Sequence, residues 1–223
     1  MPMNIAIDGP VGAGKSSIAD AVAERLGILH LDTGAMYRTV ALHALRRGAD
    51  LQDEAALDAV CEDAHVAVRY EGGVQRTLLG GEDVSDLIRT AEVSAASSAV
   101  SRWPAVRRRM VQAQREIART ADMLIDGRDI GTNVLPDAPV KIYLTASAEE
   151  RARRRHLQQQ AKGDAMPYEQ VLRELNERDR QDMNRATDPL RQAEDAVLVD
   201  STDMTPEQVV DRIVEIVEGV YGK

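Results

Sequence analysis

The chain has 223 residues, of which 43% are hydrophobic and 29% are charged, and its formal net charge is -9. This composition is typical of a globular protein with one sizeable core. The negative charge argues against binding to nucleic acid or to an anionic membrane, and no apolar run approaches the length of a membrane span. Cys61 is the only cysteine, which excludes an internal disulfide and a cysteine-based metal cluster. The first apolar stretch is too short for a signal peptide, so we expect a cytoplasmic protein.

Five short apolar runs predict the buried strands of a parallel sheet. They span residues 4–7, 28–31, 123–125, 140–144 and 196–199. An aspartate directly follows four of them, and these are Asp8, Asp32, Asp126 and Asp200. Polar residues at the carboxyl ends of parallel strands are where open α/β sheets bind their ligands. We therefore expect the functional site at this edge of the sheet.

Helical patterns separate these runs and predict a three-layer α/β fold. They cover residues 16–26, 36–47, 91–101 and 105–119. A last helix is predicted to begin at Thr205-Pro206-Glu207-Gln208, which supplies an N-cap, a proline at N1 and a glutamine at N3. Residues 66–84 differ, because alternating apolar residues and two Gly-Gly turns predict a small antiparallel meander inserted into the α/β core.

The strongest motif is a glycine-rich loop between the first strand and the first helix. Gly9-Pro10-Val11-Gly12-Ala13-Gly14-Lys15-Ser16 matches the whole phosphate-binding loop pattern. Its glycines let successive backbone N–H groups face one anion, with the helix N-terminus behind them. The motif places Lys15 on the β- and γ-phosphates of ATP, and the Ser16 hydroxyl on Mg²⁺. GTPases, motor ATPases and ATP-driven switches share this loop, so it does not by itself indicate a kinase.

A second motif follows the second strand, at Asp32-Thr33-Gly34-Ala35-Met36-Tyr37-Arg38. Thr33 is expected to cap a helix that starts near Ala35, and Arg38 lies one turn further on, where it could face an anion. The segment resembles the Thr-Gly-x-x-x-Arg of the nucleoside-monophosphate kinases. That resemblance implies that Arg38 binds the phosphate of the acceptor and that its neighbours, Thr33 included, line the acceptor site. An N-cap followed by an ordinary surface arginine remains the alternative.

A third motif, Asp126-Gly127-Arg128-Asp129-Ile130-Gly131-Thr132, ends a buried strand. It is similar to the bacterial cytidylate kinases rather than to the adenylate kinases, which carry Asp-Gly-Phe-Pro-Arg there. The resemblance implies that Arg128 binds the acceptor phosphate and that Asp129 accepts a hydrogen bond from the cytosine amino group, which uracil lacks. Asp126 could hold the Mg²⁺ shell. The alternative is that Asp126 caps a turn while Arg128 and Asp129 pair with each other.

The same resemblance runs from Ile5 to about Tyr221 and implies roles for further residues. Arg107 would contact the base or its phosphate, and Ser98 would help to recognise the base. Asp182 would bind the sugar hydroxyls of the acceptor, and Arg178 and Arg185 its phosphates. Arg154 belongs to a group of arginines that flank a helical lid over ATP. Without the resemblance, these charges would be taken for solvated helix faces, with Arg178, Asp182 and Arg185 on one face at i, i+4 and i+7.

Together these features predict a single P-loop kinase domain over residues 1–223. It would have a five-stranded parallel sheet, an acceptor-binding region at 34–100 with its antiparallel insert at about 66–84, and a lid at 151–180. The expected reaction is transfer of the γ-phosphoryl group from ATP to CMP or dCMP in pyrimidine nucleotide metabolism, with Mg²⁺, by a monomer. Ser16-Ser17 stands where Ser-Thr or Gly-Thr is common in the family, so either serine could ligate Mg²⁺, and Thr33 replaces a common serine. The alternatives are a kinase for UMP, AMP or shikimate, or an ATP-dependent switch.

Overall fold

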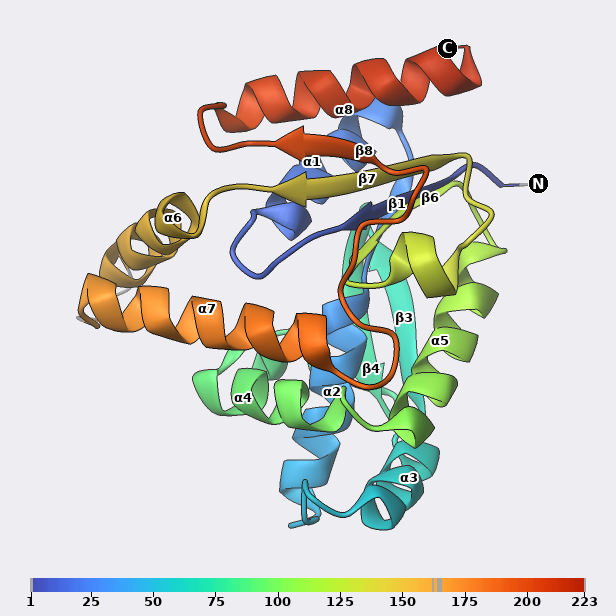
Figure 1. Cartoon of the computed structure of the whole chain (residues 1–223). Helices are drawn as coiled ribbons and strands as arrows, with labels where there is room; N and C mark the ends of the chain where they lie inside the picture. Colours follow the sequence, from blue (N-terminus) through green and yellow to red (C-terminus); the bar gives the residue numbers. More distant parts are fainter. Residues whose placement is uncertain (1, 162, 164–165, 223) are drawn as a thin grey trace. The chain divides into compact units, whose positions relative to one another are not determined.

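The computed structural model describes residues 2–161, 163 and 166–222, and the chain divides into two compact units. The first unit comprises Met1–Met3 and Ile28–Ile125, and the second comprises Asn4–Gly27 and Asp126–Lys223. Most of the first unit is therefore inserted into the sequence of the second. Figure 1 follows the chain from its blue N-terminus to its red C-terminus.

Five strands form one parallel sheet in the order β2-β6-β1-β7-β8. In the second unit, β1 pairs with β7 from Ile5↔Val140 to Asp8↔Tyr143, and β7 pairs with β8 from Ile142↔Val197 to Thr145↔Asp200. The five predicted strands are confirmed, and each one extends to include the Asp or Thr that follows its apolar run. Their bounds are β1 (Asn4–Asp8), β2 (Leu29–Asp32), β6 (Met123–Gly127), β7 (Val140–Thr145) and β8 (Val197–Asp200).

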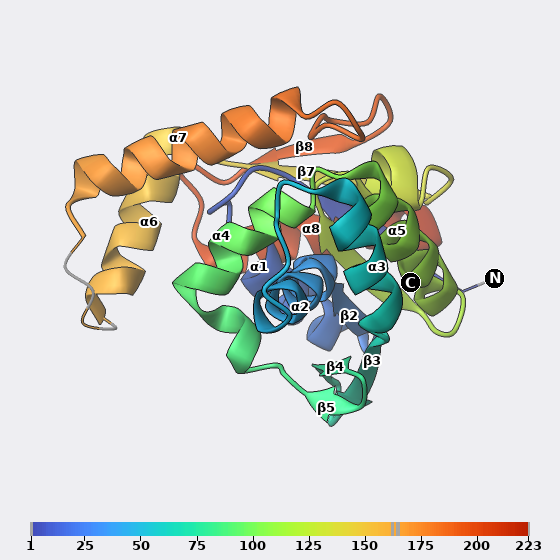
Figure 2. The ribbon, with the colours of Figure 1, turned by 90° about the horizontal axis from the view of Figure 1, so that it is seen from below.

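The second unit contains four helices and one π-helical turn among its described residues. α1 and α8 pack against each other, and α8 begins with the predicted capping box, in which the Gln208 N–H donates to Thr205 Oγ1 (3.2 Å) and the Thr205 N–H donates to Gln208 Oε1 (2.9 Å). α6 and α7 lie side by side (Figure 2). The elements are α1 (Lys15–Leu26), the π-helical turn η2 (Ile130–Val134), α6 (Ala148–Ala161), α7 (Tyr168–Asn184) and α8 (Pro206–Tyr221).

The first unit is built around α2, which packs against α3, α4 and α5. The predicted meander is a separate three-stranded antiparallel sheet in the order β3-β4-β5. Helix α3 was not predicted; Asp53 caps it by accepting the Ala55 and Ala56 N–H groups (2.9 and 3.3 Å), and its buried face includes Cys61. The elements are α2 (Thr33–Arg46), α3 (Glu54–Asp63), β3 (Val66–Glu71), β4 (Val74–Leu79), β5 (Glu82–Asp83), the 3₁₀ turn η1 (Leu87–Arg89), α4 (Ala91–Val100) and α5 (Pro104–Ala118).

Two local expectations were wrong. The cap of α2 is Asp32, not Thr33, because the carboxylate of Asp32 accepts the Ala35 N–H (2.9 Å) from a non-helical residue while Thr33 is already helical. In α7 the helix ends at Asn184, and Arg185 follows with extended backbone angles (φ −63°, ψ 143°). Arg185 therefore does not share a helical face with Arg178 and Asp182.

Candidate active site

The glycine-rich loop curls between β1 and α1 in the way the motif predicts. Gly9 has φ +155°, and a Cβ placed on it would lie 1.9 Å from the backbone oxygen of Leu144 in β7, so no larger residue fits. Gly12 and Gly14 have φ of +76° and +84°, in the left-handed region that favours glycine. Gly14 is also the N-cap of α1 and has no side chain to cap it. The first-turn N–H groups of α1 thus form the kind of helix terminus that binds anions.

Lys15 is buried at the start of α1, and its Nζ donates to the backbone oxygen of Pro10 (2.7 Å). The ammonium group therefore reaches back across the loop to its beginning. Burial, together with the positive charge of Arg128, lowers the pKa of Lys15 to about 7. An anion held by the loop would restore the ordinary pKa, so this lysine is placed to respond to a phosphate.

Ser16 and Asp126 provide oxygen atoms suited to Mg²⁺. The Ser16 hydroxyl donates to Asp126 Oδ2 at 2.8 Å, and Asp126 is buried at the end of the β6 apolar run. Mg²⁺ prefers oxygen ligands and is commonly held by one or two carboxylates together with substrate phosphates. These residues fit the ion, and the carboxylate contact distinguishes Ser16 from Ser17.

A buried ion pair from the predicted lid holds the backbone of the loop at Val11. Asp179 of α7 accepts the Val11 N–H (3.0 Å), while Arg151 of α6 donates to the Val11 oxygen (2.7 Å). Arg151 and Asp179 also pair with each other at 2.6 Å, with only 7% and 9% of their side chains exposed. The side chain of Val11 packs in a small core with Ala152, Val171 and Leu175. These contacts join α6 and α7 to the phosphate-binding loop. Residues 162 and 164–165 of the predicted lid lie outside the described residues.

Four charged residues predicted for the acceptor form two ion pairs in the second unit. Arg128 Nε donates to Asp182 Oδ2 (2.9 Å), and Arg185 Nη2 donates to Asp129 Oδ1 (3.1 Å). Asp129 and Arg185 are nearly buried, with 6% and 8% of their side chains exposed. The alternative in which Arg128 and Asp129 pair with each other is wrong. Arg178 lies one turn before Asp182 on α7 and is half-buried.

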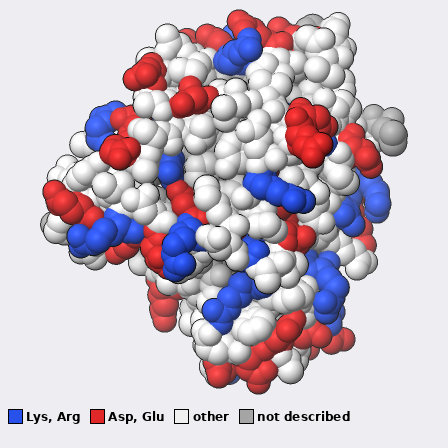
Figure 3. Space-filling model, in the orientation of Figure 1, with Lys and Arg blue, Asp and Glu red and all other residues white. Residues whose placement is uncertain are grey.

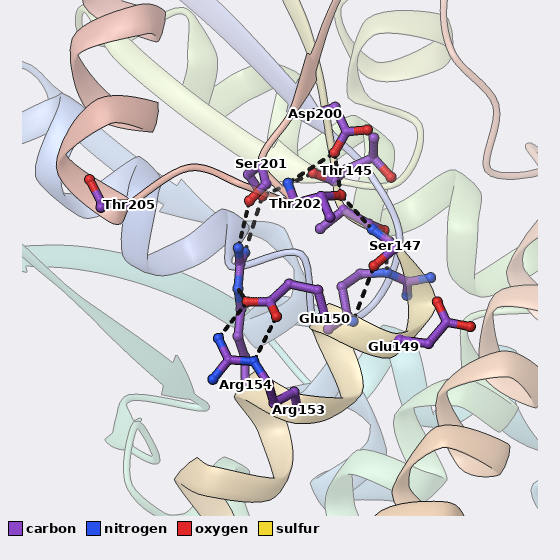
Figure 4. Close-up of polar contacts among 12 residues, drawn as sticks. Thr145, Ser147, Glu149, Glu150, Arg153, Arg154, Asp200, Ser201, Thr202 and Thr205 are labelled. Atoms are coloured by element: carbon purple, nitrogen blue, oxygen red, sulfur yellow. Dashed lines mark hydrogen bonds and ion pairs between the residues drawn. The ribbon is translucent and has the colours of Figure 1, made fainter.

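Arg154 donates hydrogen bonds to two residues, Glu150 and Ser201 (Figure 4). Its Nε donates to Glu150 Oε1 (2.7 Å), and its two terminal nitrogens donate to the hydroxyl and the backbone oxygen of Ser201 (3.1 and 2.6 Å). Glu150 also binds Arg153 (2.7 and 2.8 Å), and these hydrogen bonds lower the pKa of Glu150 to about 2. These contacts fix the orientation of the Arg154 guanidinium group, so it would lose little further rotamer entropy on binding a ligand.

The other predicted acceptor residues lie in the first unit. Arg38 pairs with Asp32 (2.7 Å), and Thr33 is buried in the first turn of α2. Arg107 is 1% exposed; it lies over the Tyr37 ring (5.5 Å to the centroid) and donates to the Ser101 oxygen (3.2 Å). Arg107 is therefore not a solvated member of the triple arginine, whereas its neighbour Arg108 is exposed. Ser98 is half-buried on α4.

Sequence analysis did not single out Asp179, which the structure places beside the loop, and it placed Asp8 at the carboxyl edge of the sheet without predicting its contact with the Asp129 turn. A signal for Asp179 was present, because it follows Val171 and Leu175 at a spacing of four residues, and all three are buried on one face of α7. A charged residue on an apolar helix face needs a partner. For Asp8 no local pattern predicts the contact, since its partners Ile130 and Gly131 are more than 120 residues away in the sequence.

Figure 3 shows one face of the molecule, and charges of both signs are mixed on it. On the face drawn in Figure 3, basic and acidic side chains lie next to one another, with no continuous basic stripe among the residues shown there. A basic stripe is the electrostatic footprint of proteins that bind nucleic-acid backbones. Over the residues with described structure, no helix combines the length and the apolar character needed to cross a membrane.

Known proteins resemble the chain over almost its whole length. A family model described as "Cytidylate kinase" matches residues 5–219. A cytidylate kinase of Mycobacterium avium is 52% identical over 96% of this chain and 94% of its own length. Another, of Geobacillus kaustophilus, is 48% identical over 99% and 98%.

Among solved structures, a gluconokinase from Sinorhizobium meliloti has a TM-score of 0.52 at 17% sequence identity, over 99% of this chain and 94% of its own. At that identity the likeness supports the fold alone, and it confirms the predicted P-loop kinase architecture. The family match and the relatives at 48–52% identity concern nearly the whole chain. We conclude that this chain belongs to the cytidylate kinase family.

Proposed function

We propose that this chain is an ATP-dependent (d)CMP kinase, which transfers the γ-phosphoryl group of ATP to a phosphate oxygen of CMP or dCMP. Membership of the cytidylate kinase family is the observation that carries this proposal. The site supports it, because a complete phosphate-binding loop occurs together with two consecutive residues, Arg128 and Asp129, whose side chains can bind a phosphate and a cytosine. A UMP, AMP or shikimate kinase, or an ATP-dependent switch, is not favoured by the family.

The phosphates of ATP would lie on the glycine-rich loop. We propose that the backbone N–H groups of residues 12–17 surround them, since the loop glycines and the uncapped start of α1 leave these groups for an anion, whereas Pro10 has no N–H and the Val11 N–H donates to Asp179. Lys15 would exchange its contact with the Pro10 oxygen for the β- and γ-phosphates. The guanidinium group of Arg154, whose orientation Glu150 and Ser201 fix, would contact ATP. The proposed ATP-binding residues of the loop are Gly9, Pro10, Val11, Gly12, Ala13, Gly14, Lys15, Ser16 and Ser17.

Ser16 and Asp126 would hold Mg²⁺, Ser16 directly and Asp126 directly or through water. When bound there, Mg²⁺ would supply positive charge against the charge that develops on the phosphates during transfer. The protein's own contribution is to keep the Ser16 hydroxyl beside the Asp126 carboxylate.

The acceptor nucleotide would be bound by its phosphate, its sugar and its base. Arg38, Arg128, Arg178 and Arg185 would bind the phosphate, because a guanidinium group forks onto two phosphate oxygens. Asp182 would accept hydrogen bonds from the sugar hydroxyls, and Thr33, Ser98 and Arg107 would line the base and its phosphate. Asp129 would accept a hydrogen bond from the cytosine amino group; its two oxygens also accept from Arg185 and from Asn133 (3.1 Å each).

Catalysis would rest on position and charge rather than on a general base. The attacking oxygen of CMP is already anionic, so no strong base is required. Lys15, Arg128, Arg178 and Arg185 would neutralise the transferring group and hold it in line. The lid comprises residues 151–180, and its closure would exclude water from the site. In an open site, water could accept the phosphoryl group and ATP would be hydrolysed. The cytoplasmic location and the monomeric state stay predictions, and size-exclusion chromatography with light scattering tests the second.

Base choice provides the sharpest test. UMP presents a carbonyl oxygen where CMP presents an amine, so Asp129 would face another acceptor, a mismatch that discriminates by about 10⁴ at best. We expect Asp129→Ala to lower kcat/KM for CMP far more than for UMP and to narrow the gap between them. Arg38→Ala and Arg128→Ala should lower both alike, since both nucleotides carry the same phosphate.

The control is Arg180→Ala, which removes an exposed arginine paired with Glu177 and should change kcat/KM for neither CMP nor UMP. A coupled ADP-release assay with CMP, dCMP, UMP and AMP measures all four variants. If Asp129→Ala lowers CMP and UMP by the same factor, Asp129 does not bind the base. If the unmodified protein turns over UMP or AMP better than CMP and dCMP, the proposed function is wrong.

A further inference from the structure

Asp8 is a buried carboxylate that the proposed chemistry does not use. It is the last residue of β1, stands directly before Gly9, and is 4% exposed. Its two oxygens accept two consecutive backbone N–H groups, Oδ1 from Ile130 (2.8 Å) and Oδ2 from Gly131 (2.7 Å). These two residues open the π-helical turn η2, and the residue before them is Asp129.

The first of these hydrogen bonds bears directly on Asp129. The Ile130 N–H belongs to the peptide group that joins Asp129 to Ile130, and the orientation of that peptide group sets ψ of Asp129. Asp129 has φ −144° and ψ 28°, outside the regular helical and strand regions. Its backbone oxygen is held from the other side of the turn by the N–H groups of Asn133 (2.9 Å) and Val134 (3.1 Å).

Gly131 has little spare room beside this contact, and the side chain that an added Cβ would crowd is that of Lys141. A Cβ on Gly131 would lie 3.4 Å from Asp8 Oδ2 and 3.2 Å from the Lys141 side chain. Keeping an ionised group in this place also costs free energy, because burial raises the pKa of Asp8 to about 6. The charge of Asp129 raises this pKa as well, whereas the Gly131 and Ile130 N–H groups and Lys15 lower it. An amino acid that costs stability where it stands is commonly retained for function.

We propose that Asp8 is a positioning residue for the choice of base: it fixes the Asp129–Ile130 peptide group and thereby aims the Asp129 carboxylate at the exocyclic amine of the acceptor. This inference rests on the proposed role of Asp129 as the group that binds the base. Asp8 itself touches neither nucleotide in this scheme. Its effect should therefore be seen in the ratio between substrates and should disappear when the Asp129 carboxylate is removed.

The test is Asp8→Asn, which keeps the shape of the side chain but turns an amide –NH₂ towards one of the two N–H donors. We expect kcat/KM for CMP to fall at least tenfold and kcat/KM for UMP to fall much less, with KM for ATP unchanged within about twofold. The matched control is Asp53→Asn, because Asp53 also accepts two backbone N–H groups (2.9 and 3.3 Å) but caps α3. Asp53→Asn should leave kcat/KM unchanged for both CMP and UMP.

A double-mutant cycle separates this inference from the proposed function. If Asp8 acts through Asp129, adding Asp8→Asn to Asp129→Ala should not narrow the CMP to UMP ratio further. If Asp129→Ala alone leaves the ratio unchanged, the proposed role of Asp129 fails first. If Asp129→Ala narrows the ratio but Asp8→Asn lowers CMP and UMP equally, or mainly raises KM for ATP, Asp8 acts on the phosphate-binding loop and the inference is overturned.

The inference would also be overturned if Asp8→Asn narrowed the CMP to UMP ratio further in the Asp129→Ala background, since Asp8 would then act independently of Asp129. Far-UV circular dichroism checks that each variant is folded. Should Asp8→Asn fail to fold, Gly131→Ala takes its place, because the added Cβ would crowd the Lys141 side chain (3.2 Å) next to the Gly131 N–H that Asp8 accepts, while keeping both charges. It should narrow the same ratio, and an unchanged ratio in that variant would count against the inference.

Discussion

Replacing Asp179 with alanine removes the carboxylate that the guanidinium of Arg151 and the backbone N–H of Val11 share. Both side chains of the ion pair are more than 90% buried. Loss of one partner of a buried pair costs about 3–5 kcal/mol, because the other charge stays in a poorly hydrated place. The unpaired Val11 N–H would add about 1–3 kcal/mol if water did not reach it. The two effects overlap, so we expect the free energy of unfolding to fall by about 3–5 kcal/mol.

Urea unfolding followed by far-UV circular dichroism measures this loss. With a slope of about 3 kcal/mol per molar urea, the midpoint should fall by more than about 1 M. Glu177→Ala is the control on the same helix: it breaks the exposed pair with Arg180, in which 50% and 67% of the two side chains are exposed, and should leave the unfolding midpoint nearly unchanged. KM for ATP should rise only in Asp179→Ala, because only that variant releases the loop. If the two variants have the same midpoint, the ion pair does not hold the loop to α7 and the reasoning is refuted.

Three further predictions concern the loop and the last helix. Binding of ATP at pH 8 should take up nearly one proton, because Lys15 with a pKa of about 7 is mostly neutral in the free protein and becomes charged beside the phosphates; calorimetry in two buffers with different ionisation enthalpies measures this, and Lys15→Ala should abolish both the uptake and the phosphoryl transfer. Gly9→Ala should prevent folding or leave an insoluble protein, whereas Gly14→Ala, whose Cβ meets no atom within 4 Å, should cost only about 1–2 kcal/mol of backbone strain; expression and thermal melting distinguish them, and equal losses would refute the close contact with Leu144. Thr205→Ala should lower the unfolding free energy by about 1 kcal/mol, since it removes half of the capping box, and an unchanged thermal midpoint would contradict this.

Features that a few consecutive residues determine could be predicted from the sequence. The five strands, the glycine-rich loop with α1 directly after it, and the Thr205–Gln208 cap depend on local patterns, and the structure confirms them. The cap of α2 was assigned to Thr33 because Thr is a good N-cap, but Asp32 one residue earlier is a better one and accepts the Ala35 N–H. Two good caps in a row cannot be ranked without the backbone angles.

The partners within the candidate site could not be predicted in the same way. Arg128 finds Asp182 and Arg185 finds Asp129 across 54 and 56 residues of sequence, and the Asp8 carboxylate finds Ile130 and Gly131 across more than 120. Such contacts depend on which loops the sheet brings together at its carboxyl edge, and no pairwise pattern in the sequence encodes that. The resemblance supplied the residues of the site, and the structure supplied their pairing.

The burial of the only thiol in the chain has a practical consequence for measuring motion. Cys61 is 6% exposed in α3, and burial raises its pKa to about 11, so it is a poor target for maleimide dyes, which react with accessible thiolates. Leu157 on α6 and Val74 on β4 are exposed by 50% and 62% and lie in different units. Cysteines introduced at these two positions would accept a donor and an acceptor dye with the native thiol left in place. Energy transfer between the dyes would then report, one molecule at a time, how the separation of the two units changes when nucleotides bind.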